Sequence, residues 1–281
     1  MKLSSLCIIT ALALSCQEEE QGLTRGDTQD ITEEALTDSY FQDMDDLGSV
    51  AIDAPSDETF EGGRKQTSIT INDDRFDCEG VVITINATGT PETPQGTITV
   101  DFGTTGCTDL RGNVRTGKLI FTYSGRRFQP GSTLVTTTDN YTINGVKLEG
   151  TRTSTNVQSS TTESPKFNVV LENGKATFED GSIATRESNI TWSWIRGANP
   201  IQDELIIDDS SEAEGTTRSG KDYVVTILED LVYQRTCFIA VGGIKKYVIN
   251  DQKEIVIDYG TGDCKTISVT VNGITRNVIL K

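Results

Sequence analysis

The spacing of apolar residues divides the chain into a short helical part and a long β part. Four apolar residues recur at intervals of four, four and three, the period of one helical face: Leu36, Tyr40, Met44 and Leu47. We predict one short helix over about residues 31–47. It would begin with a capping box formed by Asp30 and Glu33 and end near Gly48. The carboxylates Asp43, Asp45 and Asp46 predict a solvated acidic face.

From Thr67 onward the apolar period becomes two, which is the period of a β-strand. Asn or Asp followed by Gly provides the positive φ that tight hairpin turns require. Four such pairs punctuate the β part: Asn144-Gly145, Asn173-Gly174, Asp180-Gly181 and Asn272-Gly273. We therefore predict an all-β fold, an antiparallel β-sandwich or meander over residues 66–281. The short N-terminal helix and a linker would occupy residues 30–65.

An internal repeat indicates how the cysteines of the β part pair. Residues 98–107 align with residues 255–264, and each copy reads Asp-Phe-Gly-Thr or Asp-Tyr-Gly-Thr before a final cysteine. Another cysteine lies upstream of each copy. Four cysteines allow three pairings, and the repeat favours one disulfide per copy: Cys78–Cys107 and Cys237–Cys264.

The repeated Asp-Phe/Tyr-Gly-Thr stretch itself has two interpretations. We favour a strand that ends in a glycine turn and presents a cysteine for bridging. The alternative is a Ca²⁺ site that uses Asp101 and Asp258. A further acidic stretch, from Asp203 to Glu214, fits either a linker between two domains or a long loop. We favour the loop, within one continuous β domain.

Trp192 and Trp194 lie two residues apart on a predicted strand and therefore share one face with Arg196. If exposed, the two indoles would form a platform on which sugar rings stack. If buried, they would belong to the core, which is the commoner place for aromatic side chains. We favour the core and keep the pair as the candidate ligand platform.

Residues 1–15 resemble a lipoprotein signal peptide, with a basic start and an apolar run too short to span a bilayer. Leu14-Ser15-Cys16 resembles the bacterial lipobox, at which cleavage exposes a cysteine for acylation. The alternative is ordinary signal-peptide cleavage after Ala13. We predict that Cys16 carries a diacylglyceryl group that attaches the protein to a membrane through a flexible acidic tether, residues 16–29.

The acidic residues that follow Cys16 also bear on location. Glu18, Glu19 and Glu20 resemble the export signal of surface lipoproteins in Bacteroidota. The resemblance implies an outer-membrane lipoprotein that faces the outside of the cell. The alternative is the periplasmic leaflet of the same membrane.

Charge and composition exclude several classes of function. The formal net charge is -17, so the surface repels phosphate backbones and we expect no nucleic-acid partner. The chain contains no histidine, which removes the Ser-His and Cys-His nucleophile pairs and the commonest metal ligand. We therefore nominate no catalytic residue, no metal ligand and no cofactor, and expect a protein that is not an enzyme.

The combined pattern resembles a group of uncharacterised surface lipoproteins of flavobacteria, in the Bacteroidota. Four features carry the resemblance: Cys16 with its acidic follow-on, the acidic helix, residues 214–223, and residues 257–264 with Asn272-Gly273. The group implies a location and no known activity. We expect a lipid-anchored, surface-exposed envelope lipoprotein with a non-enzymatic structural or binding role and a glycan or envelope protein as partner. The alternative is a carbohydrate-binding or carbohydrate-processing surface lipoprotein.

Overall fold

The structure is a computed structural model. It describes residues 24–53 and 65–279 apart from short gaps, which are residues 69–70, 72, 74, 77, 79, 91, 111, 199–201, 235–236, 238–239 and 262–265. The predicted signal peptide over residues 1–15, Cys16 and most of the tether lie outside the described residues. No helix in the described part of the chain combines the length and the apolar composition that a bilayer crossing needs.

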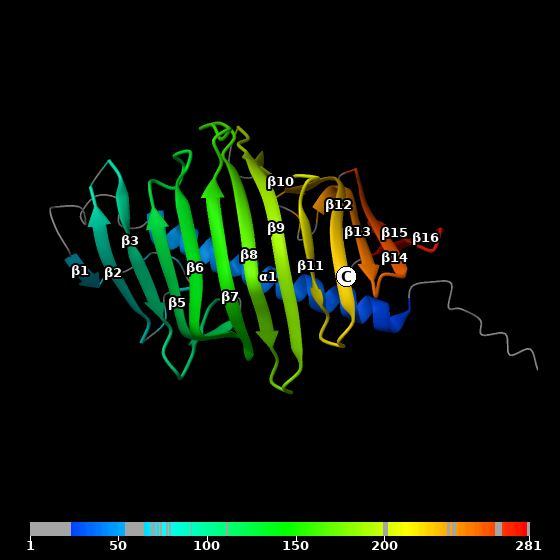
Figure 1. Cartoon of the computed structure of the whole chain (residues 1–281), viewed down its shortest axis with the longest axis horizontal. Coiled ribbons are helices and arrows are strands. Elements are labelled where there is room, and N and C mark those ends of the chain that lie inside the picture. The colour runs from blue at the N-terminus through cyan, green and yellow to red at the C-terminus, as the bar shows by residue number, and fades with distance from the viewer. Residues whose placement is uncertain are drawn as a thin grey trace, which may run out of the picture.

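The β part is one antiparallel sheet in which strands mostly pair with their neighbours in sequence (Figure 1). This confirms the all-β antiparallel prediction. Across the described residues sixteen strands join the sheet. They are β1 (Lys65–Ser68), β2 (Val82–Gly89), β3 (Pro94–Asp101), β4 (Cys107–Thr108), β5 (Val114–Ser124), β6 (Thr133–Ile143), β7 (Val146–Asn156), β8 (Lys166–Thr177), β9 (Ile183–Ile195), β10 (Glu204–Ile207), β11 (Glu212–Thr216), β12 (Asp222–Gln234), β13 (Ala240–Ile249), β14 (Lys253–Thr261), β15 (Thr266–Val271) and β16 (Ile274–Ile279).

Strands β10 and β11 occupy the acidic stretch from Asp203 to Glu214. Both pair with β9 on one side and with β12 on the other. Together they fill one strand position, interrupted at residues 208–211. The stretch is therefore part of the sheet, neither the linker nor the long loop that its acidity suggested.

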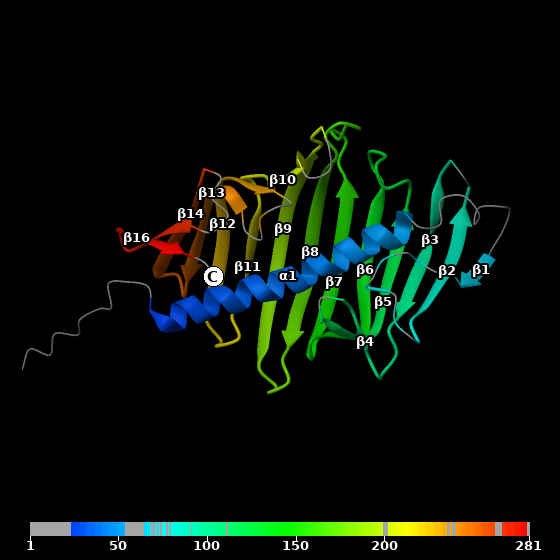
Figure 2. The same cartoon turned by 180° about the vertical axis from the view of Figure 1, so that it is seen from behind.

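The predicted β-sandwich is wrong, because a helix takes the place of a second sheet. Helix α1 (Arg25–Asp53) crosses one face of the sheet, from strand β14 at its start to strand β5 near its end (Figure 2). The opposite face carries no second layer in the described residues (Figure 1). Alternating apolar and polar residues predict one buried face per strand, but they do not specify whether a sheet or a helix covers it.

Helix α1 is longer than predicted at both ends. The backbone N–H of Asp27 donates to Thr24 Oγ1 (3.1 Å), and the N–H of Thr24 donates to Asp27 Oδ2 (2.8 Å). This reciprocal pair is the N-terminal cap, so the predicted capping box of Asp30 and Glu33 is wrong. Gly48 lies inside the helix and does not end it.

The buried stripe of helix α1 also differs from the predicted one. Leu36 is 41% exposed, whereas Met44 and Leu47 are fully buried. The buried residues of the helix recur mainly at intervals of three and four: Asp27, Asp30, Glu34, Thr37, Phe41, Met44, Leu47, Gly48 and Ala51. The first half of this stripe is polar and mostly acidic, so the apolar pattern revealed only its second half.

The core lies between helix α1 and the sheet. A large cluster of buried apolar side chains joins Phe41 and Met44 of the helix to strands β2 to β9. A second cluster covers strands β11 to β15 under the first turns of the helix, where Ile31 packs against it. The sheet is therefore apolar on the side that the helix covers, as the period of two predicted.

Three of the four predicted turns are confirmed. Asn144-Gly145 joins β6 to β7 and Asn272-Gly273 joins β15 to β16, with positive φ at every residue. Gly181 provides positive φ in the turn between β8 and β9. The fourth is wrong, because Asn173-Gly174 lies inside β8, where the register shifts in a β-bulge. A Cβ on Gly174 would lie 2.3 Å from the carbonyl oxygen of Arg186, so glycine permits the close approach of β9.

One disulfide is present in the described part of the chain. It is the predicted pair Cys78–Cys107, with a Cα–Cα distance of 5.5 Å. The other predicted pair is Cys237–Cys264, and Cys264 lies outside the described residues. That pairing stays a prediction.

The internal repeat forms the same turn twice. The N–H of Gly103 donates to Asp101 Oδ1 (2.9 Å), and the N–H of Gly260 donates to Asp258 Oδ1 (2.8 Å). Both glycines have a φ near 70°, 71° and 69°. Both copies therefore form an Asx turn that glycine completes. In the first copy this turn ends strand β3, the interpretation favoured from the sequence, whereas in the second copy β14 continues to Thr261.

Candidate functional site

Arginines and lysines of the sheet and its turns pair with the carboxylates of helix α1, and we call this row of ion pairs the helix–sheet seam. Its members run along the whole helix: Asp27 with Lys253, Asp30 with Lys221, Glu34 and Asp38 with Arg186, Asp43 with Arg115, and Asp45 with Arg152. The predicted solvated acidic face is therefore wrong for Asp43 and Asp45, which are paired with arginines of the sheet, whereas Asp46 is exposed as predicted. In the sequence, the seam carboxylates resemble solvent-exposed residues, because their cationic partners lie far away along the chain.

Arg186 has the most buried environment of the seam. Its side chain is 2% exposed and pairs with Glu34, which is 1% exposed, and with Asp38 at 2.9 Å. The hydroxyl of Tyr247 donates to the second oxygen of Glu34 at 2.8 Å. Every member of this group has a partner, which is what a buried ion pair needs to be tolerated.

Arg115 forms the corresponding group near the other end of the helix. It pairs with Asp109 at 2.6 Å and with Asp43 at 2.8 Å. Burial alone would raise the pKa of Asp109, but hydrogen bonds from Arg115 and Asn113 lower it to about 2. These two groups have an evident structural role. Arg186 Nε lacks a hydrogen-bond partner within the described residues, but Arg186 lines neither of the two cavities described below.

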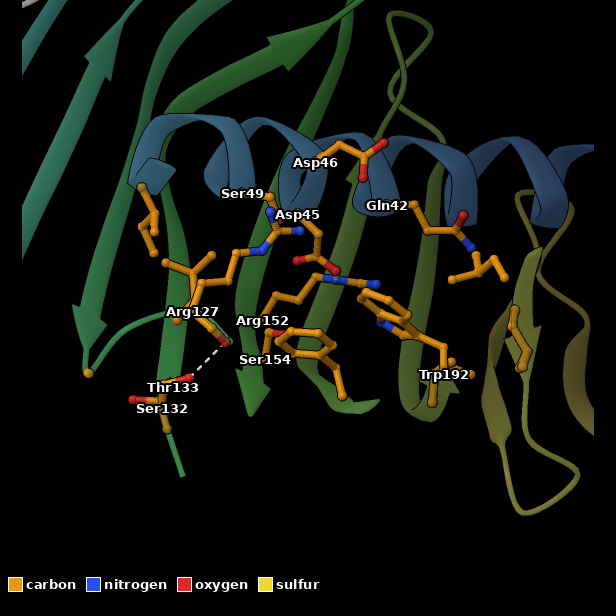
Figure 3. Close-up of a pocket in the computed structure, with 17 residues that line it drawn as sticks. Gln42, Asp45, Asp46, Ser49, Arg127, Ser132, Thr133, Arg152, Ser154 and Trp192 are labelled. Carbon is orange, nitrogen blue, oxygen red and sulfur yellow. Dashed lines mark hydrogen bonds and ion pairs between the residues drawn. The ribbon is translucent and has the colours of Figure 1, made fainter. Parts of the chain in front are cut away.

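The seam is different at Asp45 and Arg152, because a cavity opens beside them. The cavity has a volume of about 200 Å³ and lies between the second half of helix α1 and strands β6 to β10 (Figure 3). The loop between β5 and β6 contributes Gly125, Arg127 and Ser132 to its wall. We call it the inner cavity.

The inner cavity is mostly polar on its helix side, whereas its sheet side combines apolar side chains with the polar residues Thr133, Arg152 and Ser154. The helix contributes the polar residues Gln42, Asp45, Asp46 and Ser49. The sheet contributes the apolar side chains Leu134, Phe167, Ile190, Trp192, Leu205 and Ile207. Figure 3 shows Arg127, Arg152 and Trp192 gathered beneath the helix turn that carries Asp45. A molecule in this space would meet an apolar surface on one side and hydrogen-bonding groups on the other.

Two buried polar atoms at this cavity lack a hydrogen-bond partner within the described residues. Arg152 Nε donates to Asp45 Oδ2 at 2.5 Å, which leaves Arg152 Nη1 and Asp45 Oδ1 unpaired. Arg152 is 4% exposed, and burial raises the pKa of Asp45 although Arg152 counteracts it. An unpaired buried donor beside an unpaired buried acceptor is costly. A ligand with hydroxyl groups could satisfy both.

Trp192 and Trp194, the candidate platform, both face this region and are half-buried. Trp192 stacks on Phe167 with 4.7 Å between ring centroids. Trp194 lies 6.3 Å from Phe128, and the guanidinium of Arg196 lies 5.0 Å from its ring centroid. The pair is thus neither fully in the core nor a bare surface platform, since both rings help to line cavities.

A second cavity, which we call the outer cavity, continues from the first and has a volume of about 400 Å³. Trp194, Tyr233, Gln234 and Glu204 line it. The two cavities share five lining residues: Asp46, Ser49, Arg127, Trp192 and Leu205. Together they form one groove along strand β9.

Sequence reasoning nominated the two tryptophans of this groove and missed Asp45 and Arg152. An arginine among the polar positions of a Thr-rich strand gives no signal of burial. The only available hint was that Arg152 takes the place of an inward-facing residue in the alternation of β7. Among the described residues, no group of three or more acidic or cysteine side chains is arranged to hold a metal ion.

Comparisons with known proteins identified no similar family, protein or structure. A scan against protein-family models, a search of curated proteins and a search of solved structures each returned no match. The site is therefore interpreted from its own geometry.

Proposed function

We propose that this chain is a lipid-anchored, surface-exposed envelope lipoprotein that binds a small ligand, without chemical conversion, in the groove between helix α1 and the sheet. Cys16 is the proposed attachment point, in an outer membrane, and the acidic residues after it support the outward-facing orientation. The observation that carries the binding role is the unpaired donor and acceptor, Arg152 Nη1 and Asp45 Oδ1, at a preformed cavity.

Several features support a binding role over catalysis. The two carboxylates of the inner cavity, Asp45 and Asp46, come from adjacent positions of the helix. The sheet side of that cavity contributes Thr133, Arg152 and Ser154 as its polar residues, and none of them is a carboxylate. Glycoside hydrolysis requires two carboxyl groups that flank the bond to be broken, and Asp45 is held by Arg152. The inner cavity therefore favours recognition of a ligand.

The binding role is tested with the mature chain carrying Cys16→Ser, so that no acyl chain is attached. The probes are amino acids, nucleosides, neutral saccharides and medium-chain fatty acids. A ligand of the folded state raises its stability in proportion to RT ln(1 + [L]/Kd), so thermal unfolding followed by circular dichroism reports binding. We expect one class to raise the unfolding temperature. No shift with any of the four classes overturns the proposal.

A blocking variant locates the binding. Ser49 lines both cavities, and Ser49→Trp should fill the groove without burying an unpaired charge. Ser39 lies on the same helix and is exposed, so Ser39→Trp is the matched control. We expect the ligand-induced shift to disappear in Ser49→Trp and to persist in Ser39→Trp. Equal shifts in both variants would place the ligand elsewhere.

Attachment is tested in cells. Wild type should incorporate labelled palmitate and sediment with membranes, and Cys16→Ala should do neither, because acyl chains supply the membrane affinity. Protease added to intact cells should remove the wild-type protein if it faces outward. Full protection in intact cells together with loss after permeabilisation would assign it to the periplasmic leaflet instead.

A further inference from the structure

We infer that the ligand of the groove is an uncharged saccharide and that two consecutive sugar rings occupy it, one in the inner cavity and one in the outer. This inference rests on the proposed binding function and deepens it. It is carried by the division of the groove into polar and apolar sides, by its charge, and by the register of its aromatic side chains.

The two-sided lining of the inner cavity matches a pyranose ring. Such a ring presents C–H groups on its faces and hydroxyl groups around its edge. Trp192 and Phe167 offer aromatic surface to the faces. Arg152 Nη1 offers a donor and Asp45 Oδ1 an acceptor on the other side, and one hydroxyl or two neighbouring hydroxyls satisfy both, since a hydroxyl donates and accepts.

The charge of the lining favours an uncharged ligand. The ionisable residues of the inner cavity are two carboxylates and two guanidiniums: Asp45, Asp46, Arg127 and Arg152. They cancel, and Arg152 is already paired with Asp45. A carboxylate group on the ligand would lose its hydration without gaining a free counter-charge from Arg152. A fatty acid would fill the apolar side but leave Arg152 Nη1 and Asp45 Oδ1 unsatisfied.

The strand register supplies two successive places for a ring. Phe167, Trp192 and Ile207 lie directly opposite one another across β8, β9 and β10. Two residues further along β9, Trp194 lies opposite Leu205, which in turn lies opposite Tyr233 of β12. The first row lines the inner cavity and members of the second row line the outer cavity.

The separation of these rows agrees with a short sugar chain. Two residues along an antiparallel strand span about 6.8 Å, which is of the order of one linked pyranose unit. In the outer cavity Gln234 and Glu204 are hydrogen-bonded to each other at 3.1 Å and provide polar groups at the edge of the second ring position. We therefore assign Trp192 to the first ring and Trp194 to the second.

The experiment uses the mature Cys16→Ser chain and isothermal titration calorimetry. The probes are glucose, galactose, mannose and N-acetylglucosamine, with cellobiose, maltose, lactose, β1,4-mannobiose and chitobiose as two-ring partners and glucuronate as the charged counterpart of glucose. We expect a neutral sugar to bind, its disaccharide to bind about tenfold more tightly, as one added aromatic stack allows, and glucuronate not to bind.

Two variants separate the ring positions. Trp194→Ala should reduce the affinity for the disaccharide to that for the monosaccharide and leave the monosaccharide unchanged. Trp192→Ala should abolish binding of both. Circular dichroism of each variant serves to verify folding, and Ser49→Trp and Ser39→Trp provide a second, independent test of the location.

The outcomes distinguish this inference from the proposed function. A ligand from another of the four chemical classes, with no sugar binding, overturns the saccharide and leaves the binding role intact. Sugar binding that Trp194→Ala weakens equally for one and two rings overturns the two-ring arrangement. Failure of every class to bind overturns the binding role and this inference together.

Discussion

Individual side chains of the seam decide how helix α1 lies on the sheet. Arg186 is the clearest case, because the sheet places it beneath two carboxylates of the helix, Glu34 and Asp38. Arg186 lies about 150 residues further along the chain than the two carboxylates. None of their neighbours in sequence distinguishes them from solvated residues.

Removing Arg186 should therefore be costly. Arg186→Met removes the cation in closest contact with buried Glu34 and leaves Lys245 at 4.0 Å, and we expect the free energy of unfolding to fall by about 3–5 kcal/mol. Urea unfolding followed by tryptophan fluorescence measures the loss. Arg218 is the matched control, since it is partly exposed and pairs with exposed Asp180, and Arg218→Met should cost about 1 kcal/mol or less. Equal losses would contradict a special role of burial.

The residues that line the groove show which parts of the candidate site could be predicted from the sequence. Trp192 and Trp194 were nominated because two indoles at a spacing of two must share a face. Arg152 and Asp45 were missed because what distinguishes them is one buried atom each without a hydrogen-bond partner. An unpaired donor or acceptor is a property of the surroundings, and the sequence does not contain the surroundings.

At the scale of elements, helix α1 packs so closely that one of its residues must be glycine. A Cβ on Gly48 would lie 2.8 Å from two ring carbons of Phe121 and 3.0 Å from Leu134. Phe121 is fully buried and cannot move aside. From the sequence Gly48 predicted the end of the helix, because glycine usually marks a C-terminal cap. The close approach of the sheet explains why it lies inside instead.

Gly48→Ala should therefore reverse the usual effect of alanine in a helix. Alanine normally stabilises a helix by up to about 1 kcal/mol relative to glycine, but crowding against Phe121 should cost about 1–3 kcal/mol. We expect a net fall in the urea midpoint. Gly26→Ala in the same helix is the control, since its Cβ would meet nothing closer than 3.7 Å, and it should raise the midpoint. A rise in both variants would show that the helix can shift.

The strands and turns were the elements that sequence predicted best. Period-two alternation and Asx-Gly pairs are local signals, and Asn144-Gly145 and Asn272-Gly273 form the predicted hairpin turns. Asn173-Gly174 carries the same local signal but forms a bulge, because the strands on both sides of β8 continue past it. Whether such a pair turns the chain depends on the neighbouring strands.

At the scale of the whole molecule, the ion pairs tie stability to pH. Hydrogen bonds from Lys253 and Thr24 lower the pKa of Asp27 against the opposing effect of burial, and Arg115 and Asn113 lower that of Asp109 to about 2 from 3.8. A carboxylate with a lowered pKa in the folded state stabilises the fold above its unfolded pKa. That stability is lost as the pH falls through the folded pKa.

We therefore expect the free energy of unfolding to decline steeply between about pH 4 and pH 2, the window set by these lowered values. Asp45 acts in the opposite direction, because its pKa is raised and protonation relieves the cost of its buried charge. Urea titrations across this window measure the slope. Asp109→Asn should be less stable at neutral pH and should show a shallower decline. A slope equal to that of wild type would exclude Asp109 as a contributor.

The amino-acid sequence predicts the local features of this protein: the strands, most of the turns, the pairing of Cys78 with Cys107, and the presence of one N-terminal helix. These depend on residues that are near one another in the chain or on a repeat within it. That the helix, rather than a second sheet, covers the apolar face of the sheet is visible only in the tertiary structure. The acidic half of that helix can lie against the sheet because Lys253, Lys221 and Arg186 pair with its carboxylates. Only folding brings these three cations together. The same long-range placement created the groove beside Arg152, in which the tryptophans acquire a candidate function.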